Sequence, residues 1–353
     1  MSAFPYRLER LGVLMSPDPE APFEAEGVLN PASGRSPDGT VWLLPRMVAK
    51  GNVSRVGLAE VIVAGGVPVD VRRESVVLSP DAGWEHAHTH GGVEDPRTTW
   101  VPDLGLHLMT YIAFGPLGPR PALAVSADLR TWRRLGPIHF EYAEELDADL
   151  NLFPNKDVVF FPSPVPGPDG APAYAMLHRP MWNIGLRTGT VDEYPPAGVD
   201  DPRPEIWITY VAVADVQRDL RALTHLGGHR AVALPAFDWE SVKIGAGPPP
   251  LRVDEGWLLL HHGVTGVEVP GWEPQGNLHY AAGGMLLDAA DPGRVIARTD
   301  SPLMAPSVAE ERRGTVPNVV FPTAIEEIDG QQFVFYGMAD SSIGVARLEK
   351  VAL

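Results

Sequence analysis

The chain has 353 residues, 44% of them hydrophobic, so it is long enough to bury a large core. Lys and Arg total 28 against 45 Asp and Glu, which gives a formal net charge of -17. A surface this acidic repels nucleic acids and anionic membranes, so neither is an expected partner. The chain has no cysteine, which excludes disulfides, thiolate nucleophiles and cysteine-based metal sites.

The N-terminal residues contain no apolar segment of the length that a signal peptide needs. No apolar run in the chain approaches the ~18 residues of a membrane span. We therefore expect a soluble, cytoplasmic protein. A homo-oligomer is compatible with the sequence, which does not decide the oligomeric state.

Turn-forming residues divide the chain into short elements, because 36 Gly and 37 Pro are scattered along it. Runs of β-branched and aromatic residues of strand length lie between them. The predicted strands are 58–64, 106–114, 158–161, 206–213, 257–261 and 333–336. Hairpin turns are predicted at Asp38-Gly39, Asp169-Gly170 and Asp329-Gly330. Only residues 213–226 predict a helix, because their apolar side chains recur at helical spacing.

This pattern predicts an all-β protein, and we expect residues 1–353 to form a single domain. A weak repeat of about 25 to 40 residues favours a β-propeller, since that is near the scale of a four-stranded blade. Each unit starts with an acidic or Pro-containing turn and continues through an apolar strand to a polar Ser/Asp segment. The repeat is too degenerate to give the number of blades.

Residues 91–97, Gly-Gly-Val-Glu-Asp-Pro-Arg, place two acids before a proline and an arginine. Pro96 disfavours helical backbone at Asp95 and predicts an extended conformation there. Such a carboxylate would be held stiffly at the start of a strand, where Glu94 and Arg97 can set its charge state. These residues alone are compatible with a catalytic acid or with a surface ion pair beside a turn.

Other segments combine short polar or basic residues with predicted turns or strand ends; they are 155–157, 178–180, 243–247, 261–264 and 336–340. Taken singly, each is more typical of a solvated turn than of a site. Together with residues 94–97, these segments resemble the motifs of glycoside hydrolase family 130, the β-mannoside phosphorylases and β-mannosidases, both in their order and in their amino-acid sequences. Further matching segments are 43–46, 126–132, 283–288, 291–292 and 314–322. The resemblance runs from about Asn30 to Leu348 and implies a five-bladed β-propeller with its site at the central end of the channel.

The resemblance implies that Asp95 is the sole general acid of the protein, able to deliver its proton to the glycosidic oxygen through a hydroxyl of the mannose ring. It implies that a basic set binds inorganic phosphate, namely Lys156, Arg179, Lys243 and His262. A third set is implied to contact sugar or to support the acid, namely Asn30, Arg46, Arg97, Asn155, Asp157 and Asp340. No metal or cofactor is implied; phosphate would be a co-substrate and a β-mannoside oligosaccharide the substrate.

The residue types agree with phosphorolysis. An inverting hydrolase needs an acid and a base, whereas phosphate arrives already anionic and needs cations to hold it. The basic set predicts a cationic pocket in an acidic protein. We therefore predict an inverting β-mannoside phosphorylase that releases α-mannose 1-phosphate. An alternative is a β-1,2-mannosidase of the same family with Glu240 or Glu273 as base. Another alternative is a sugar-binding propeller, although a binding module needs no general acid.

A histidine cluster, His86, His88 and His90, leaves three interpretations open. On an extended chain the imidazoles would share one face, which is compatible with a metal site. The same residues could form a loop over the sugar site or an ordinary polar edge. The resemblance implies no metal here.

Overall fold

A computed structural model of the protein describes residues 4–86, 91–182, 194–269 and 275–351. The all-β prediction is confirmed, because strands dominate the described residues. Each of the predicted strand segments overlaps a strand of the structure. The three predicted turns each join two strands that pair in antiparallel fashion.

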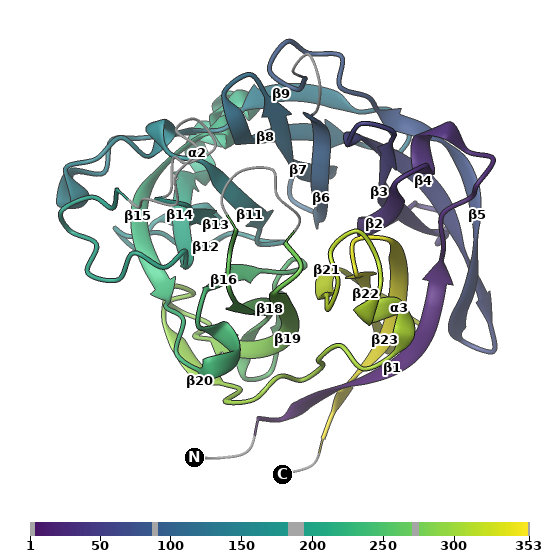
Figure 1. The fold of residues 1–353 in the computed structure, drawn as a ribbon. Coiled ribbons are helices and arrows are strands. Elements are labelled where there is room, and N and C mark those ends of the chain that lie inside the picture. Colours follow the sequence, from purple (N-terminus) through teal and green to yellow (C-terminus); the bar gives the residue numbers. More distant parts are fainter. Residues whose placement is uncertain (1–3, 87–90, 183–193, 270–274, 352–353) are drawn as a thin grey trace.

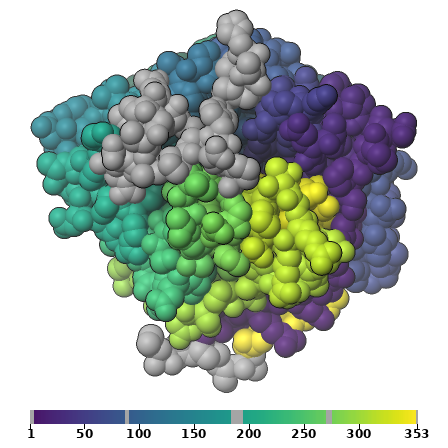
Figure 2. All heavy atoms as spheres, in the orientation of Figure 1, coloured from purple at the N-terminus to yellow at the C-terminus, as the bar shows by residue number. Residues whose placement is uncertain are grey.

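The two ends of the chain meet in one sheet. Its order is β1 (Tyr6–Met15), β23 (Ser342–Lys350), β22 (Gln331–Met338) and β21 (Val320–Ile328). The first and last strands are antiparallel, with Tyr6 opposite Lys350. Figure 1 shows the N- and C-termini near each other. In the space-filling view of Figure 2, the purple N-terminal and yellow C-terminal segments share one edge of the molecule.

An eight-stranded sheet among the described residues consists of two consecutive antiparallel groups. The first contains β2 (Gly27–Arg35), β3 (Val41–Ala49), β4 (Val53–Ala64) and β5 (Val67–Leu78). The second contains β6 (Gly91–Val101), β7 (Leu106–Gly115), β8 (Gly118–Ser126) and β9 (Arg133–Pro137). Parallel pairing of Ser54 with Gly92 joins them. Gly92 has φ +130, and a Cβ there would lie 2.3 Å from the Ser54 carbonyl oxygen, so only glycine fits.

Two more sheets complete the described strands. One contains β10 (His139–Phe140), β11 (Asn155–Phe160), β12 (Val165–Pro166), β13 (Pro172–Pro180), β14 (Ile206–Ala212) and β15 (His225–Ala233). The other contains β16 (Lys243–Ala246), β17 (Leu251–Val253), β18 (Gly256–Gly266), β19 (Leu278–Leu287) and β20 (Val295–Arg298). Figure 1 shows the sheets around a common centre, with β2, β6, β11, β16 and β21 nearest to it.

The predicted helix at 213–226 is only partly correct. Helix α2 (Val213–Arg218) ends early, a 3-10 turn η4 (Leu220–Thr224) follows, and β15 begins at His225. Asp219 separates the two with an extended backbone, and its side chain accepts a hydrogen bond from the Arg221 amide. The apolar spacing is therefore divided between two short elements because Asp219 ends one and caps the next. The other short helices of the described residues are η1 (Pro22–Glu24), η2 (Glu144–Leu146), η3 (Leu150–Leu152), η5 (Asp238–Glu240) and α3 (Ala309–Arg312).

The hydrophobic core lies between neighbouring sheets. Val158 and Phe160 of β11 pack toward β7 and β8. Val159 of β11 and Phe161, the residue that follows the strand, pack toward β16, β18 and β19. Successive strand residues point to opposite faces, so a strand covered on both sides is apolar throughout. This arrangement explains why the sequence shows continuous apolar runs rather than alternation.

Candidate active site

Three inner strands position polar side chains by the same backbone device. Asn30 in β2, Asp95 in β6 and Asp157 in β11 have φ of 40, 46 and 53. Each lies where the strand pairing shifts register, as in a β-bulge. The prediction of an extended Asp95 is therefore wrong. Pro96 disfavours the right-handed helical region, and Asp tolerates the left-handed region better than most residues.

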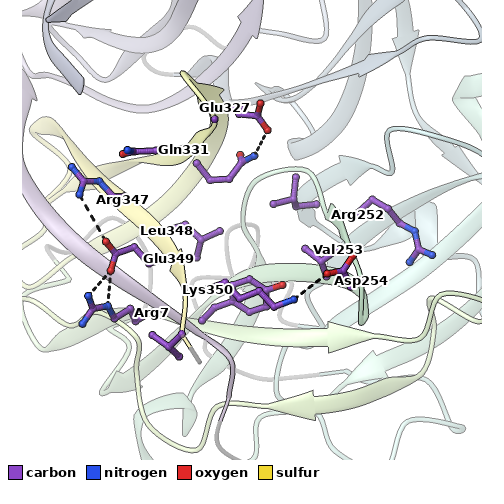
Figure 3. Close-up of a pocket in the computed structure, with 15 residues that line it drawn as sticks. Arg7, Arg252, Val253, Asp254, Glu327, Gln331, Arg347, Leu348, Glu349 and Lys350 are labelled. Atoms are coloured by element: carbon purple, nitrogen blue, oxygen red, sulfur yellow. Dashed lines mark hydrogen bonds and ion pairs between the residues drawn. The ribbon is translucent and has the colours of Figure 1, made fainter. Parts of the chain in front are cut away.

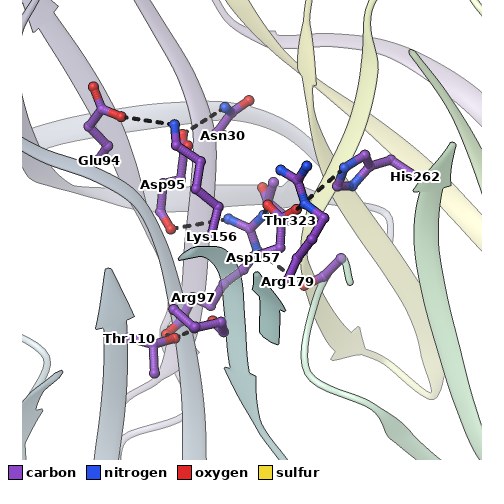
Figure 4. A network of polar contacts seen from close by, with 12 residues as sticks. Asn30, Glu94, Asp95, Arg97, Thr110, Lys156, Asp157, Arg179, His262 and Thr323 are labelled. Atoms are coloured by element: carbon purple, nitrogen blue, oxygen red, sulfur yellow. Dashed lines mark hydrogen bonds and ion pairs between the residues drawn. The ribbon is translucent and has the colours of Figure 1, made fainter. Parts of the chain in front are cut away.

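These side chains line a central cavity of about 370 Å³. Most of the predicted site residues lie on its wall: Asn30, Arg46, Asp95, Lys156, Asp157, Arg179, Lys243, His262 and Asp340. These residues lie in or next to strands of different sheets, so the cavity is formed where the sheets face one another. Figure 4 shows Lys156 directed toward Glu94, with Arg179 and His262 converging on Asp157.

Asp95 is held by two donors on one oxygen. Its Oδ1 accepts hydrogen bonds from Asn30 Nδ2 and from Arg46 Nη1, both at 2.9 Å. The other end of the Arg46 fork, Nη2, donates to Glu94 Oε1 at 2.9 Å. Burial by itself would raise the pKa of Asp95, but Arg46, Lys156 and Arg97 outweigh it and hold that pKa well below its usual range. The carboxylate is therefore ionised in the free protein.

The basic set is paired with carboxylates. Lys156 Nζ lies 3.3 Å from Glu94 Oε2, and Arg179 Nε donates to Asp157 Oδ2 at 2.6 Å. A third ion pair joins Lys243 to Glu268. The predicted cationic pocket is therefore not an uncompensated one, since nearby acids pair with these cations.

His262 is not a cation in this site. Burial lowers its pKa to about 3, because the charged imidazolium is disfavoured away from water. Its Nε2 lies 3.5 Å from Asp157 Oδ2, and the ring is tilted by 57° against Phe321 with the centroids 4.4 Å apart. A neutral imidazole can still donate one hydrogen bond to a ligand.

Some buried polar atoms of the cavity have no hydrogen-bond partner. Within the described parts of the chain, Arg179 Nη1 and both ring nitrogens of His262 make no hydrogen bond. Buried polar atoms are nearly always satisfied in folded proteins, so unsatisfied ones at a cavity indicate a place for a ligand or water. The free N–H of Arg179 and the one N–H of the neutral His262 ring are therefore donors available to a ligand in this cavity, which Lys243 also lines.

Two predicted site residues lie behind the cavity wall. Arg97 is 1% exposed, and its Nε donates to the Gly247 carbonyl at 3.0 Å. Asn155 is bonded to His178 Nδ1 at 2.9 Å and accepts from the Arg179 amide at 3.2 Å. Their contacts are with the wall itself rather than with the open space, so any effect on a ligand is indirect.

The sequence analysis missed several residues of the wall: Met181, Glu268, Gln275, Leu278, Tyr280, Val316, Val319 and Phe321. Val316, Val319 and Phe321 fall within the matching segment 314–322, which was a usable signal. Glu268 follows β18 in Val-Glu-Val-Pro and carries no such signal.

The two carboxylates suggested as a hydrolytic base have different outcomes. Glu240 is wrong as a candidate, because it is fully buried outside the cavity wall and bonded to His261 Nε2 at 2.9 Å and Arg298 Nη2 at 2.7 Å. Glu273 lies outside the described residues. His88 and His90 also lie outside them, so the histidine cluster is not tested.

Two other observations concern the described ranges only. Residues 4–86, 91–182, 194–269 and 275–351 contain no group of three or more His, Asp or Glu side chains placed to hold a metal ion. Over the same ranges, none of the helices combines the length and hydropathy required to traverse a lipid bilayer.

A larger concavity of about 670 Å³ lies on the sheet that joins the chain ends. Figure 3 shows Arg7 and Arg347 directed toward Glu349, and Lys350 toward Asp254. Arg7 Nη2 lies 2.6 Å from Glu349 Oε2, and Lys350 Nζ lies 3.2 Å from Asp254 Oδ2. These are exposed ion pairs between strand edges, a common surface arrangement. The central cavity, with its buried acids and unsatisfied donors, is therefore the candidate active site.

Comparison with known proteins gives the family. The model of glycoside hydrolase family 130, described as beta-1,4-mannooligosaccharide phosphorylase, matches residues 46–352. The chain belongs to glycoside hydrolase family 130, and the predicted resemblance is confirmed.

Two curated relatives come from Thermoanaerobacter sp. (strain X514). A 1,2-beta-oligomannan phosphorylase is 32% identical over 262 residues, covering 73% of this chain and 68% of the relative. A beta-1,2-mannobiose phosphorylase is 33% identical over 262 residues, covering 73% and 67%. The solved structure of beta-1,2-mannobiose phosphorylase from Listeria innocua matches 99% of this chain and 97% of that chain, with a TM-score of 0.70 and 22% identity. At that identity the match shows a shared fold.

Proposed function

We propose that the protein is an inverting β-mannoside phosphorylase, which cleaves a β-mannosidic bond with inorganic phosphate and releases α-mannose 1-phosphate. Family membership and the phosphorylase names of the relatives support this function. The observation that carries it is the pairing of one buried acid, Asp95, with unsatisfied buried donors on Arg179 and His262 in the same cavity. Such donors suit an anion.

The finer description of the fold is part of this proposal. The groups β2–β5 and β6–β9, the two sheets that contain β11 and β16, and the sheet of β1 with β21–β23 each contain at least four strands. We assign them as the blades of one five-bladed propeller that forms a single catalytic domain over residues 1–353. The pairing of β1 with β23 would close its last blade. A cytoplasmic location stays a prediction from the sequence.

In the proposed reaction, a phosphate oxygen attacks the anomeric carbon from the face opposite the leaving group. The new C–O bond forms as the glycosidic C–O bond breaks, so the configuration inverts in one displacement. Asp95 supplies the proton for the leaving oxygen, through a mannose hydroxyl as the family resemblance implies. No protein base is required, because phosphate is already the nucleophile.

Phosphate would be held by Lys156, Arg179, Lys243 and neutral His262. The fork of Arg179 is already committed to Asp157 through Nε, which leaves Nη1 for a phosphate oxygen. His262 would contribute a hydrogen bond rather than charge, because burial keeps it neutral.

The sugar ring would lie against the other side of the cavity. Asn30, Arg46 and Asp340 line that wall around Asp95, with Asp157 at the boundary to the basic set. Arg97 and Asn155 would support the wall from behind.

The decisive experiment follows mannobiose cleavage with and without phosphate. The curated Thermoanaerobacter relatives are named for β-1,2-linked substrates, so β-1,2-mannobiose is the first substrate and β-1,4-mannobiose the comparison. Phosphorus NMR should show α-mannose 1-phosphate, with a rate that saturates in phosphate. Mannose release at full rate in phosphate-free buffer, with no sugar phosphate on adding phosphate, would establish the mannosidase. Binding without cleavage in either buffer would establish the sugar-binding module.

A further inference from the structure

A second cavity lies at the other end of the inner strands. Its volume is about 720 Å³, larger than that of the candidate active site. The early residues of the inner strands line the active site, whereas their late residues line this distal cavity: Ser33 in β2, Thr98 and Trp100 in β6, and Glu326 in β21. Along β6, Asp95 and Trp100 are five residues apart, or roughly 16 Å at about 3.3 Å per residue. The two cavities are therefore separate sites.

The distal cavity contains buried polar atoms without partners. Thr98 is 6% exposed and His107 is 2% exposed. Over the described ranges, Thr98 Oγ1 and His107 Nδ1 make no hydrogen bond. Because buried polar atoms are rarely left unsatisfied, these two atoms indicate a hydrogen-bonding ligand or water in this space.

The groups available in the cavity favour a neutral ligand. Burial lowers the pKa of His107 to about 4, so its imidazole is uncharged near neutral pH. Burial also raises the pKa of Glu326 to about 7, and its carboxyl accepts a hydrogen bond from Ser33 Oγ at 2.9 Å. Arg35, the guanidinium on this wall, donates to the carbonyls of Gly39 and Glu327. An anion would find no uncommitted cation among these residues.

An aromatic ring and proline rings supply apolar surface beside these polar atoms. Trp100 is 45% exposed, and its ring centroid lies 4.6 Å from that of His107. Pro102, Pro162 and Pro250 add apolar surface to the same cavity. An apolar wall with a few convergent hydrogen-bonding groups is typical of small-molecule sites. A hexopyranose has the matching chemistry: one apolar C–H face and a rim of hydroxyls.

We propose that the distal cavity binds a neutral hexopyranose ring, stacked on Trp100 and hydrogen-bonded to Thr98 and His107. The choice of a mannosyl ring as its natural occupant rests on the proposed function, whereas the binding of a neutral sugar does not. Such a site would hold one mannosyl unit of an oligosaccharide on the face opposite the active site.

The test counts the sugar-binding sites of a variant that is expected not to cleave the sugar. Isothermal titration of Asp95→Asn protein with β-1,2-mannobiose should give two binding events. Adding Trp100→Ala should remove one of them or weaken it about 10-fold, the scale of an aromatic contact. Trp84→Ala is the matched control, since Trp84 is 39% exposed and lies outside both cavities. Thr98→Val gives a second, nearly isosteric variant, which should weaken the same event without changing the other.

The result also separates this proposal from the proposed function. With Asp95 intact, Trp100→Ala should leave kcat/KM for mannobiose phosphorolysis unchanged. D-Mannose and D-glucose are titrated in parallel, so distal binding can be read even if no sugar phosphate is formed. Sugar binding that shows no event weakened by either Trp100→Ala or Thr98→Val would overturn the distal site, whereas a single event that these variants weaken would keep the distal site and count against the proposed function.

Discussion

Replacing Arg179 by lysine is the most direct test of the proposed phosphate site. Arg179 is 5% exposed; its Nε donates to Asp157 at 2.6 Å, while its buried Nη1 has no partner in the described parts of the chain. Lysine keeps a positive charge beside Asp157 but lacks the planar fork that reaches two groups at once. The variant therefore loses the donor offered to phosphate without leaving Asp157 as an unpaired buried charge. Arg179→Ala would lose the donor and would also leave Asp157 as an unpaired buried charge, so it is less informative.

A hydrogen bond to a charged group contributes about 1.5–3 kcal/mol. The KM for phosphate should therefore rise roughly 10- to 100-fold in Arg179→Lys, since about 1.4 kcal/mol corresponds to a factor of ten. Initial rates of α-mannose 1-phosphate formation, measured against both phosphate and β-1,2-mannobiose, give the two KM values. Arg230→Lys is the control, because Arg230 forms an exposed ion pair with Asp291. A wild-type phosphate KM in Arg179→Lys would refute the reasoning, and an equal rise in both KM values would indicate general distortion.

Three other substitutions test the remaining groups of the cavity. Asp95→Asn keeps a hydrogen-bond acceptor but removes the transferable proton, so kcat should fall about 100- to 10,000-fold while calorimetry shows mannobiose binding retained; wild-type turnover in the folded variant would exclude the acid role. Glu268→Gln removes the carboxylate paired with Lys243. Since partly exposed pairs contribute about 0.2–1 kcal/mol, the phosphate KM should fall by about 1.5- to 5-fold, and a rise would show that Glu268 assists phosphate instead. Burial, opposed by Arg46 and aided by Asp95, raises the pKa of Asp340 from 3.8 to about 6. The native state then holds this proton more tightly than the unfolded chain, so ionisation of Asp340 reduces stability as pH rises from about 4 to 6. Asp340→Asn should raise the free energy of unfolding by up to about 3 kcal/mol at pH 7 and by little at pH 4, and thermal unfolding with the same gain at both pH values would contradict this.

The strands could be predicted because local composition and tertiary packing agree. The run Val158 to Phe161, which ends one residue beyond β11, is apolar on both faces, as expected of a segment between two cores. The predicted helix failed for a reason that periodicity does not contain. Its apolar spacing continues through Asp219, but the extended backbone and capping side chain of that residue divide it.

The candidate site shows a similar division. The polar residues could be identified, and most of them line one cavity. Their backbone conformation was not predicted: Asn30-Pro31 in β2 and Asp95-Pro96 in β6 share an Asx-Pro dipeptide at a register shift, but the proline pointed to an extended Asp95 rather than to the observed φ of 46. The carboxylates that form ion pairs with the basic residues of the cavity could not be predicted. Glu268 has no distinguishing sequence context, yet it pairs with Lys243.

Pairing each cation with a carboxylate allows a protein of net charge -17 to build an anion site without buried, unpaired positive charge. The same pairing keeps Asp95 ionised, because Arg46, Lys156 and Arg97 act on it together. A phosphate bound beside Lys156 adds negative charge to this network and weakens the attraction that the cations exert on the Asp95 carboxylate. The pKa of Asp95 then rises toward the range that a general acid needs. Phosphate binding and protonation of the acid are therefore coupled in the proposed mechanism. In that mechanism, the charges that hold Asp95 in place would keep it ionised, and so unable to donate a proton, until phosphate binds.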